Sequence, residues 1–126
     1  MAVLFAQFSG TKQFLAAFTP IPGLTLTLPE GVQESALVIL NVPASYAIIA
    51  NWTGGQGGRF GISVNGTMLP AYAGYNYTTS IPLQNVDARV PATLVVGVPL
   101  TLKPQTVVGL AYNCIIDSTA SLSALI

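Results

Sequence analysis

Residues 24–28 read Leu24-Thr25-Leu26-Thr27-Leu28, a strict alternation of apolar and polar side chains. Successive side chains of a β-strand point to opposite faces, so this pattern predicts a strand with one buried and one solvated face. Pro29-Glu30-Gly31 follows and supplies a turn. The next apolar run, Ala36–Val42, reads ALVILNV, which predicts a strand covered on both faces.

The rest of the chain continues in short β-type segments, and none has the length and periodicity of a long helix. Asn65-Gly66 separates Phe60–Val64 from Thr67–Tyr72, and this dipeptide is a strong signal for a hairpin. The other predicted strands are Ala2–Phe8, Gln13–Phe18, Tyr75–Ile81, Ala92–Val98, Leu100–Leu102, Val107–Ile116 and Ala120–Ile126. About ten strands at regular spacing predict an all-β sandwich or jelly roll. We expect residues 1–126 to form a single domain.

The charge content excludes several classes of function. The chain has 126 residues, of which four are basic and four acidic, so its formal net charge is zero. So few cations cannot neutralise many phosphates, which argues against nucleic-acid binding. The chain has no His, which excludes His-based catalysis and His-ligated metal sites, and one Cys allows no internal disulfide. We expect no metal or other cofactor.

We expect no membrane insertion. The charge-free stretch Ser35–Gly58 contains Pro43 and several Asn and Gly residues, whereas a membrane-spanning helix needs about 20 mainly apolar residues. Met1–Gly10 has no basic residue before its apolar run, so it is not a normal secretory signal, and the cellular location stays open. A chain with only 6% charged residues needs to hide apolar surface, which favours self-association. We expect an oligomer.

Catalytic chemistry has few candidate residues. Asp87 and Asp117 are the carboxylates that could face each other across a cleft, as glycoside hydrolysis requires. Their spacing does not place them there, and a turn residue or a surface ion pair explains each of them. Cys114 lies in an apolar segment of a chain without His, which predicts a core residue and not a nucleophile. We therefore expect that the protein is not an enzyme.

Residues 72–89 are a candidate carbohydrate site. They combine aromatic rings, amides, hydroxyls, a carboxylate and a guanidinium in Tyr72, Tyr75, Asn76, Tyr77, Thr78, Thr79, Asp87 and Arg89. A neutral sugar can stack its C–H face on Tyr and exchange hydrogen bonds with Asp and Arg. The alternative is a strand whose tyrosines pack partly in the core.

Several short stretches, in order from about residue 21 onward, carry a family resemblance. They are Ile21-Pro22-Gly23-Leu24, Val38-Ile39-Leu40-Asn41-Val42-Pro43, Tyr46-Ala47, Tyr77, Ile81-Pro82, Arg89 with Pro91, Thr93-Leu94-Val95, Ile116-Asp117-Ser118 and Ala120-Ser121-Leu122-Ser123-Ala124. In this set the chain resembles the tumour-necrosis-factor-like fucose-binding lectins, represented by the N-terminal domain of the two-domain Burkholderia superlectin.

The resemblance implies a jelly roll of the tumour-necrosis-factor-like type that assembles as a homotrimer. It further implies that fucosylated oligosaccharides or glycoconjugates bind between neighbouring protomers, without a metal. It places Tyr46, Tyr77, Arg89 and the pair Asp117-Ser118 near the sugar. Among them we expect Arg89 to contribute most, because a guanidinium can donate to two vicinal hydroxyls.

The sequence departs from the family pattern at several of these positions. Leu110 stands where the family has its second sugar-binding arginine, and Arg59 stands where it has a tyrosine. Asn76 replaces a threonine, and Asp87 lies in a longer loop where the family has small hydroxyl residues. We include Arg59, Asn76 and Asp87 in the candidate site, since Arg59 offers a charge that could replace the one absent at Leu110. The alternative is a structural or adhesive trimeric jelly-roll protein, of a phage or a surface appendage, without a sugar pocket.

Overall fold

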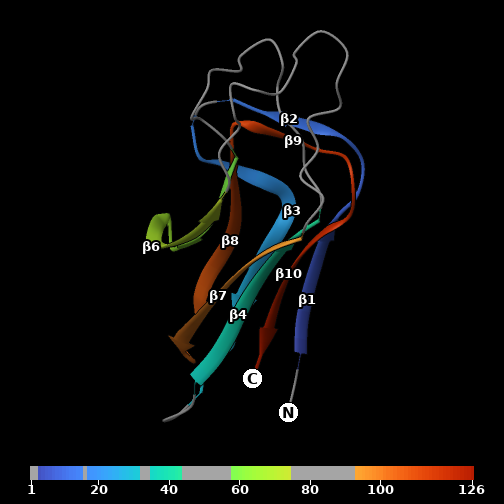
Figure 1. Ribbon diagram of the computed structural model, residues 1–126. Coiled ribbons are helices and arrows are strands. Elements are labelled where there is room, and N and C mark those ends of the chain that lie inside the picture. Colours follow the sequence, from blue (N-terminus) through green and yellow to red (C-terminus); the bar gives the residue numbers. More distant parts are fainter. Residues whose placement is uncertain (1–2, 16, 32–34, 44–57, 75–92) are drawn as a thin grey trace, which may run out of the picture.

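The computed structural model describes residues 3–15, 17–31, 35–43, 58–74 and 93–126. This part of the chain forms ten strands and no helix (Figure 1). The strands are β1 (Val3–Phe8), β2 (Lys12–Phe14), β3 (Thr19–Leu28), β4 (Ser35–Val42), β5 (Arg59–Val64), β6 (Thr67–Gly74), β7 (Leu94–Thr101), β8 (Gln105–Tyr112), β9 (Cys114–Ile116) and β10 (Ala120–Leu125).

Eight of the strands form two antiparallel sheets of four. The first sheet has the order β1-β10-β4-β7, and the second has the order β3-β8-β5-β6. The chain crosses repeatedly between the sheets, and this strand order is that of a jelly roll. The short β2-β9 pair crosses one end of the sandwich, and β1 lies beside β10 along the first sheet (Figure 1). The all-β jelly-roll sandwich expected from the sequence is confirmed.

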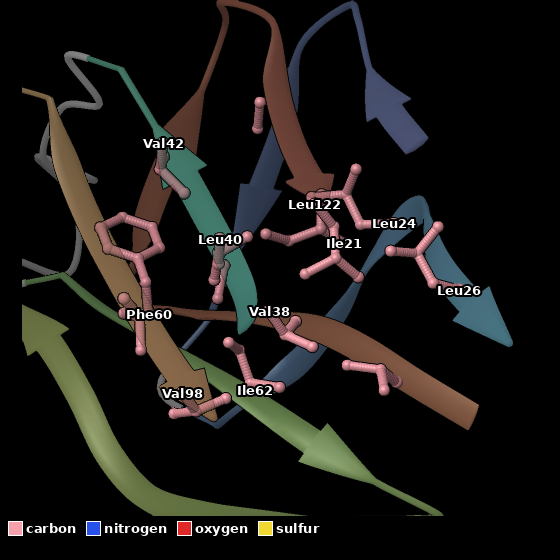
Figure 2. Close-up of a cluster of buried hydrophobic side chains, with 14 of the residues drawn as sticks. Ile21, Leu24, Leu26, Val38, Leu40, Val42, Phe60, Ile62, Val98 and Leu122 are labelled. Carbon is pink, nitrogen blue, oxygen red and sulfur yellow. The ribbon is translucent and has the colours of Figure 1, made fainter. Parts of the chain in front are cut away.

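The core lies between the inner faces of the two sheets. Alternate residues of β4 point inward, so Ala36, Val38, Leu40 and Val42 are all buried. Figure 2 shows Val38 and Leu40 among side chains from the second sheet, including Ile62. The alternation of residues 24–28 has the predicted result, since the leucines are buried and Thr25 and Thr27 are exposed.

The hairpin predicted at Asn65-Gly66 is confirmed. Both residues have positive φ, 50° and 87°, which matches the turn that joins two antiparallel strands by two residues. The Asn65 side chain also fixes the turn against β8, because its Oδ1 accepts a hydrogen bond from the Thr106 backbone N–H at 2.9 Å. This hairpin holds β5 and β6 together beside β8.

Three strand predictions need correction. Gln13–Phe18 is a strand only as far as Phe14, because the segment pairs with the three-residue β9 alone. Val107–Ile116 is divided at Asn113, whose φ of 56° interrupts the extended backbone. The two strands predicted around Pro99 are one strand, β7. Pro99 is tolerated there because β7 is an edge strand.

The prediction that Ala36–Val42 is covered on both faces is also wrong for the single chain. Its outward side chains are only partly covered, and Leu37 is 41% exposed. The predicted strand Tyr75–Ile81 lies outside the described residues. In the part of the chain that is described, no helix is long and apolar enough to cross a membrane.

Candidate functional site

Arg59 is the candidate sugar-binding residue that the structure places in a sheet. It begins β5, where it pairs with Tyr112 of β8 on one side and Gly74 of β6 on the other. Because Gly74 has no side chain, the aliphatic stem of Arg59 can lie directly against it. Arg59 Nη1 donates to the carbonyl oxygen of Gly58 at 2.9 Å. The half-buried guanidinium is thereby held at the end of the second sheet where β8 leads into β9.

An aromatic pair lies beside Arg59. The rings of Phe18 and Tyr112 have their centroids 5.2 Å apart at an interplanar angle of 36°. Tyr112 is also the register partner of Arg59, so the ring pair and Arg59 lie on adjacent strands, with the Arg59 side chain directed toward Gly74 on the other side of β5. Aromatic faces and forked donors are the groups with which proteins bind neutral sugars. Sequence reasoning missed both rings, since they are 94 residues apart and meet only through the pairing of β3 with β8.

Asp117 and Ser118 lie in the connection between β9 and β10. Ser118 Oγ donates to Asp117 Oδ1 at 3.5 Å, so the two predicted residues are in contact with each other. The next residue, Thr119, shares a hydroxyl–hydroxyl hydrogen bond of 3.1 Å with Ser9. The pair therefore leads into β10 of the first sheet, whereas Arg59 begins β5 of the second, with β6 to β9 between them along the chain.

The other predicted site residues lie outside the described part of the chain. They are Tyr46, Asn76, Tyr77, Asp87 and Arg89. Their roles stay predictions. Tyr72, at the start of the same polar and aromatic segment, is described and is 59% exposed on β6.

Cys114 is buried in the core, as predicted. No cluster of three or more residues suited to hold a metal ion occurs among residues 3–15, 17–31, 35–43, 58–74 and 93–126. Leu110, the apolar residue at the position of the family's second arginine, is buried on β8 next to Gly61 of β5.

The outer face of the first sheet carries no charged residue on its described strands, and two of its rows are mostly apolar. Register places Phe5, Ser123, Ile39 and Gly97 in one row across the four strands. The row beside it contains Val3, Leu125, Leu37 and Pro99. Phe5 is 60% exposed. Val95, which is 53% exposed, lies in a third row with the polar residues Gln7, Ser121 and Asn41. Contiguous apolar patches of this kind mark interaction surfaces in soluble proteins.

Comparison with known proteins gives one family and one described structural neighbour. A family model with the description "Bc2l-C, N-terminal domain" matches residues 7–125. Comparison with curated proteins gives no match. A solved structure described as "EclA C-terminal domain; sugar-binding protein" overlaps with a TM-score of 0.44 at 10% identity, over 99% of this chain and 79% of that one. The family match spans nearly the whole chain, and the protein belongs to the family of Bc2l-C N-terminal domains.

Proposed function

We propose that the protein is a carbohydrate-binding lectin that holds sugars reversibly and performs no chemistry on them. The observation that carries this proposal is the family match over residues 7–125, since the resemblance to that family implies sugar binding. The geometry at the end of the second sheet supports it. There Arg59 and the Phe18–Tyr112 ring pair lie on adjacent strands, and such groups suit a polar ring with one apolar face.

The finer proposal is that the ligands are fucosylated glycans, bound without metal between protomers of a homotrimer. The residues proposed to form the site are Tyr46, Arg59, Asn76, Tyr77, Asp87, Arg89, Asp117 and Ser118. Arg59 begins β5 of the second sheet, whereas the Asp117-Ser118 pair lies in the connection that leads into β10 of the first sheet. A site shared between protomers offers one way for both to contact the same sugar.

The outer face of the first sheet supports self-association. It exposes Phe5, Leu37 and Val95, and the described strands of this sheet carry no charged residue. The sequence predicted that the strand containing Leu37 is covered on both faces, whereas Leu37 is exposed in the single chain. A second copy packed on this face would cover these side chains and complete the burial that the sequence indicates. Single-site affinity for a monosaccharide would be weak, and three sites on one assembly would raise avidity by about 10²–10⁴ on a glycosylated surface.

A glycan array with the purified protein tests the proposal. We expect selective binding to fucosylated glycans, and loss of that binding in Arg89→Ala, because the main donor to vicinal hydroxyls is removed. Lys103→Ala is the matched control, since it removes an exposed positive charge in the β7–β8 turn. Full binding by Arg89→Ala would contradict the site, and selective binding to a different sugar would contradict fucose but keep the lectin.

Arg59 provides a second test of the site. Arg59→Lys keeps the charge but loses the planar fork of donors. We expect weaker glycan binding by this variant, measured by titration calorimetry, with the oligomeric state unchanged. Unchanged affinity in both Arg59→Lys and Arg59→Ala would remove Arg59 from the site.

The alternative proposal is a structural or adhesive trimer without a sugar pocket. The observation that favours it is Leu110, since a buried leucine supplies no donor where the family has an arginine. The same array separates the two proposals. A folded, trimeric protein that binds no glycan would favour the structural one.

A further inference from the structure

The outer face of the second sheet has a gap in its side-chain cover. Register places Met68, Ser63 and Val108 in one row across β6, β5 and β8, and Tyr72, Gly61 and Leu110 in a parallel row. Gly61 contributes no side chain, and the Met68 methyl group lies over it, 2.5 Å from the position that a Cβ would occupy. Met68 therefore covers the position at Gly61, and a hollow lies beside Met68 on the same face.

The hollow is a pocket of about 380 Å³. Phe18, Pro20, Met68, Val108 and Leu110 line it with apolar groups, and Ser63 lines it with a hydroxyl. This volume is near the lower limit of ligand sites, which run from about 300 to 1,000 Å³. The pocket therefore suits a ring-sized group, and the flexible Met68 side chain allows its shape to adapt.

Ser63 is the polar group of the pocket. It is only 6% exposed, and its hydroxyl makes no hydrogen bond to any residue in the described ranges. Buried polar side chains are nearly always hydrogen-bonded, so an unpartnered one needs an explanation. A ligand oxygen in the pocket would supply the missing partner, since a serine hydroxyl can both donate and accept.

We propose that this pocket binds a small neutral amphiphile: one apolar ring carrying a single hydroxyl or carbonyl group. A charged ligand is disfavoured because every lining residue is uncharged. Arg59 lies on the same face, but it stands beyond Gly61 and does not line the pocket. A sugar is disfavoured because the lining offers one polar side chain, and several buried hydroxyls would lose their water partners. The proposal does not rest on the lectin function, although Phe18, whose ring contacts Tyr112 next to Arg59, also lines this pocket.

An amide-detected NMR titration of the whole protein tests the proposal. The probe is benzyl alcohol, with benzoate and myo-inositol as the charged and polyhydroxylated comparisons. We expect saturable shifts at Ser63, Val108 and Leu110 with benzyl alcohol, at about millimolar affinity for so small a ligand. Benzoate should bind at least tenfold more weakly, and myo-inositol should leave these signals in place.

Two variants locate the site. Val108→Phe fills the pocket from a half-buried position and should abolish the shifts, with an unchanged melting temperature as evidence of folding. Ser63→Ala removes the hydroxyl and should weaken benzyl alcohol binding about three- to tenfold, the effect of one hydrogen bond. Thr27→Ala is the matched control, because it removes an exposed hydroxyl elsewhere on the outer face of the second sheet.

Three results would overturn the proposal. The first is the absence of saturable shifts in the wild-type protein, or equal binding by Val108→Phe. The second is binding of myo-inositol as tight as that of benzyl alcohol, which would make the pocket a sugar subsite. The third is a change of the pocket signals with protein concentration in the absence of probe, which would assign the pocket to a contact between copies. None of these results depends on the glycan array.

Discussion

The two sheets resemble each other on their inner faces and differ on their outer faces. The outer face of the first sheet is an uncharged surface in which exposed Phe5 and Leu37 alternate with small residues. The outer face of the second sheet has Arg59 at one end, exposed threonines on β3 and a pocket around Ser63. The common fold therefore leaves the outer residues free to differ. One face suits contact between copies, and the other suits contact with ligands.

The largest expected effect comes from the core that both faces share. Phe60 on β5 is 1% exposed, and Phe60→Ala should lower the free energy of unfolding by about 3–5 kcal/mol. Urea denaturation at one protein concentration measures the change. Tyr72→Ala is the control, because the Tyr72 side chain is mostly exposed and its loss should change stability little. Equal losses in the two variants would mean that Phe60 is not a core residue.

The next expected effect separates the two outer faces. Phe5→Glu places a charge in the uncharged outer face of the first sheet and should convert the proposed oligomer to monomers, measured by size-exclusion chromatography with light scattering. Thr27→Glu introduces the same charge on the outer face of the second sheet and should leave the assembly intact. If Thr27→Glu dissociates the oligomer and Phe5→Glu does not, the faces have been assigned the wrong way round.

A smaller effect is expected at the hairpin that supports the second sheet. Gly66 has φ of +87°, and Gly66→Ala should lower the free energy of unfolding by about 1–2 kcal/mol through backbone strain. Gly97 on the first sheet is the matched control. Its φ is ordinary, and an added Cβ would meet only Leu37 Cδ1, at 3.9 Å. Destabilisation by Gly97→Ala as large as that by Gly66→Ala would exclude the positive φ as the cause.

The smallest effect is expected at the end of the sandwich, which belongs to neither outer face. Lys12 Nζ lies 5.7 Å from the centroid of the Phe14 ring. Lys12→Ala should lower the free energy of unfolding by about 0.5 kcal/mol, and Lys12→Arg should preserve most of it. Thermal denaturation of the three proteins measures the difference. A loss of several kcal/mol would show that Lys12 has a larger structural role.

Local patterns predicted the fold well. The alternation of residues 24–28 and the Asn65-Gly66 turn act over a few residues, so the sequence shows them directly. The errors come from longer-range context. Pro99 is tolerated because β7 is an edge strand, and the order of the strands is not visible in the sequence around Pro99. At the break between β8 and β9, the Asn113 N–H donates to the carbonyl oxygen of Leu15, which is far from Asn113 in sequence.

The candidate site was less predictable for the same reason. The Phe18–Tyr112 contact and the pocket around Ser63 exist only because β3, β8, β5 and β6 lie side by side. The family alignment led to Arg59 and the Asp117-Ser118 pair as candidates, but only the structure places Arg59 at the start of β5 and the pair in the connection between β9 and β10. The sequence could propose single candidate residues, whereas the residues that lie next to them in the fold could not be read from it.

The position of β10 has a consequence for the order in which the chain is made. β10 is last in sequence among the ten strands, yet it lies between β1 and β4. Until a ribosome has released these residues, β1 and β4 each have an edge without its partner, and such edges invite pairing with other chains. The first sheet can close only after synthesis reaches Leu125. A nascent or truncated chain without β10 should therefore depend on chaperones to stay unaggregated.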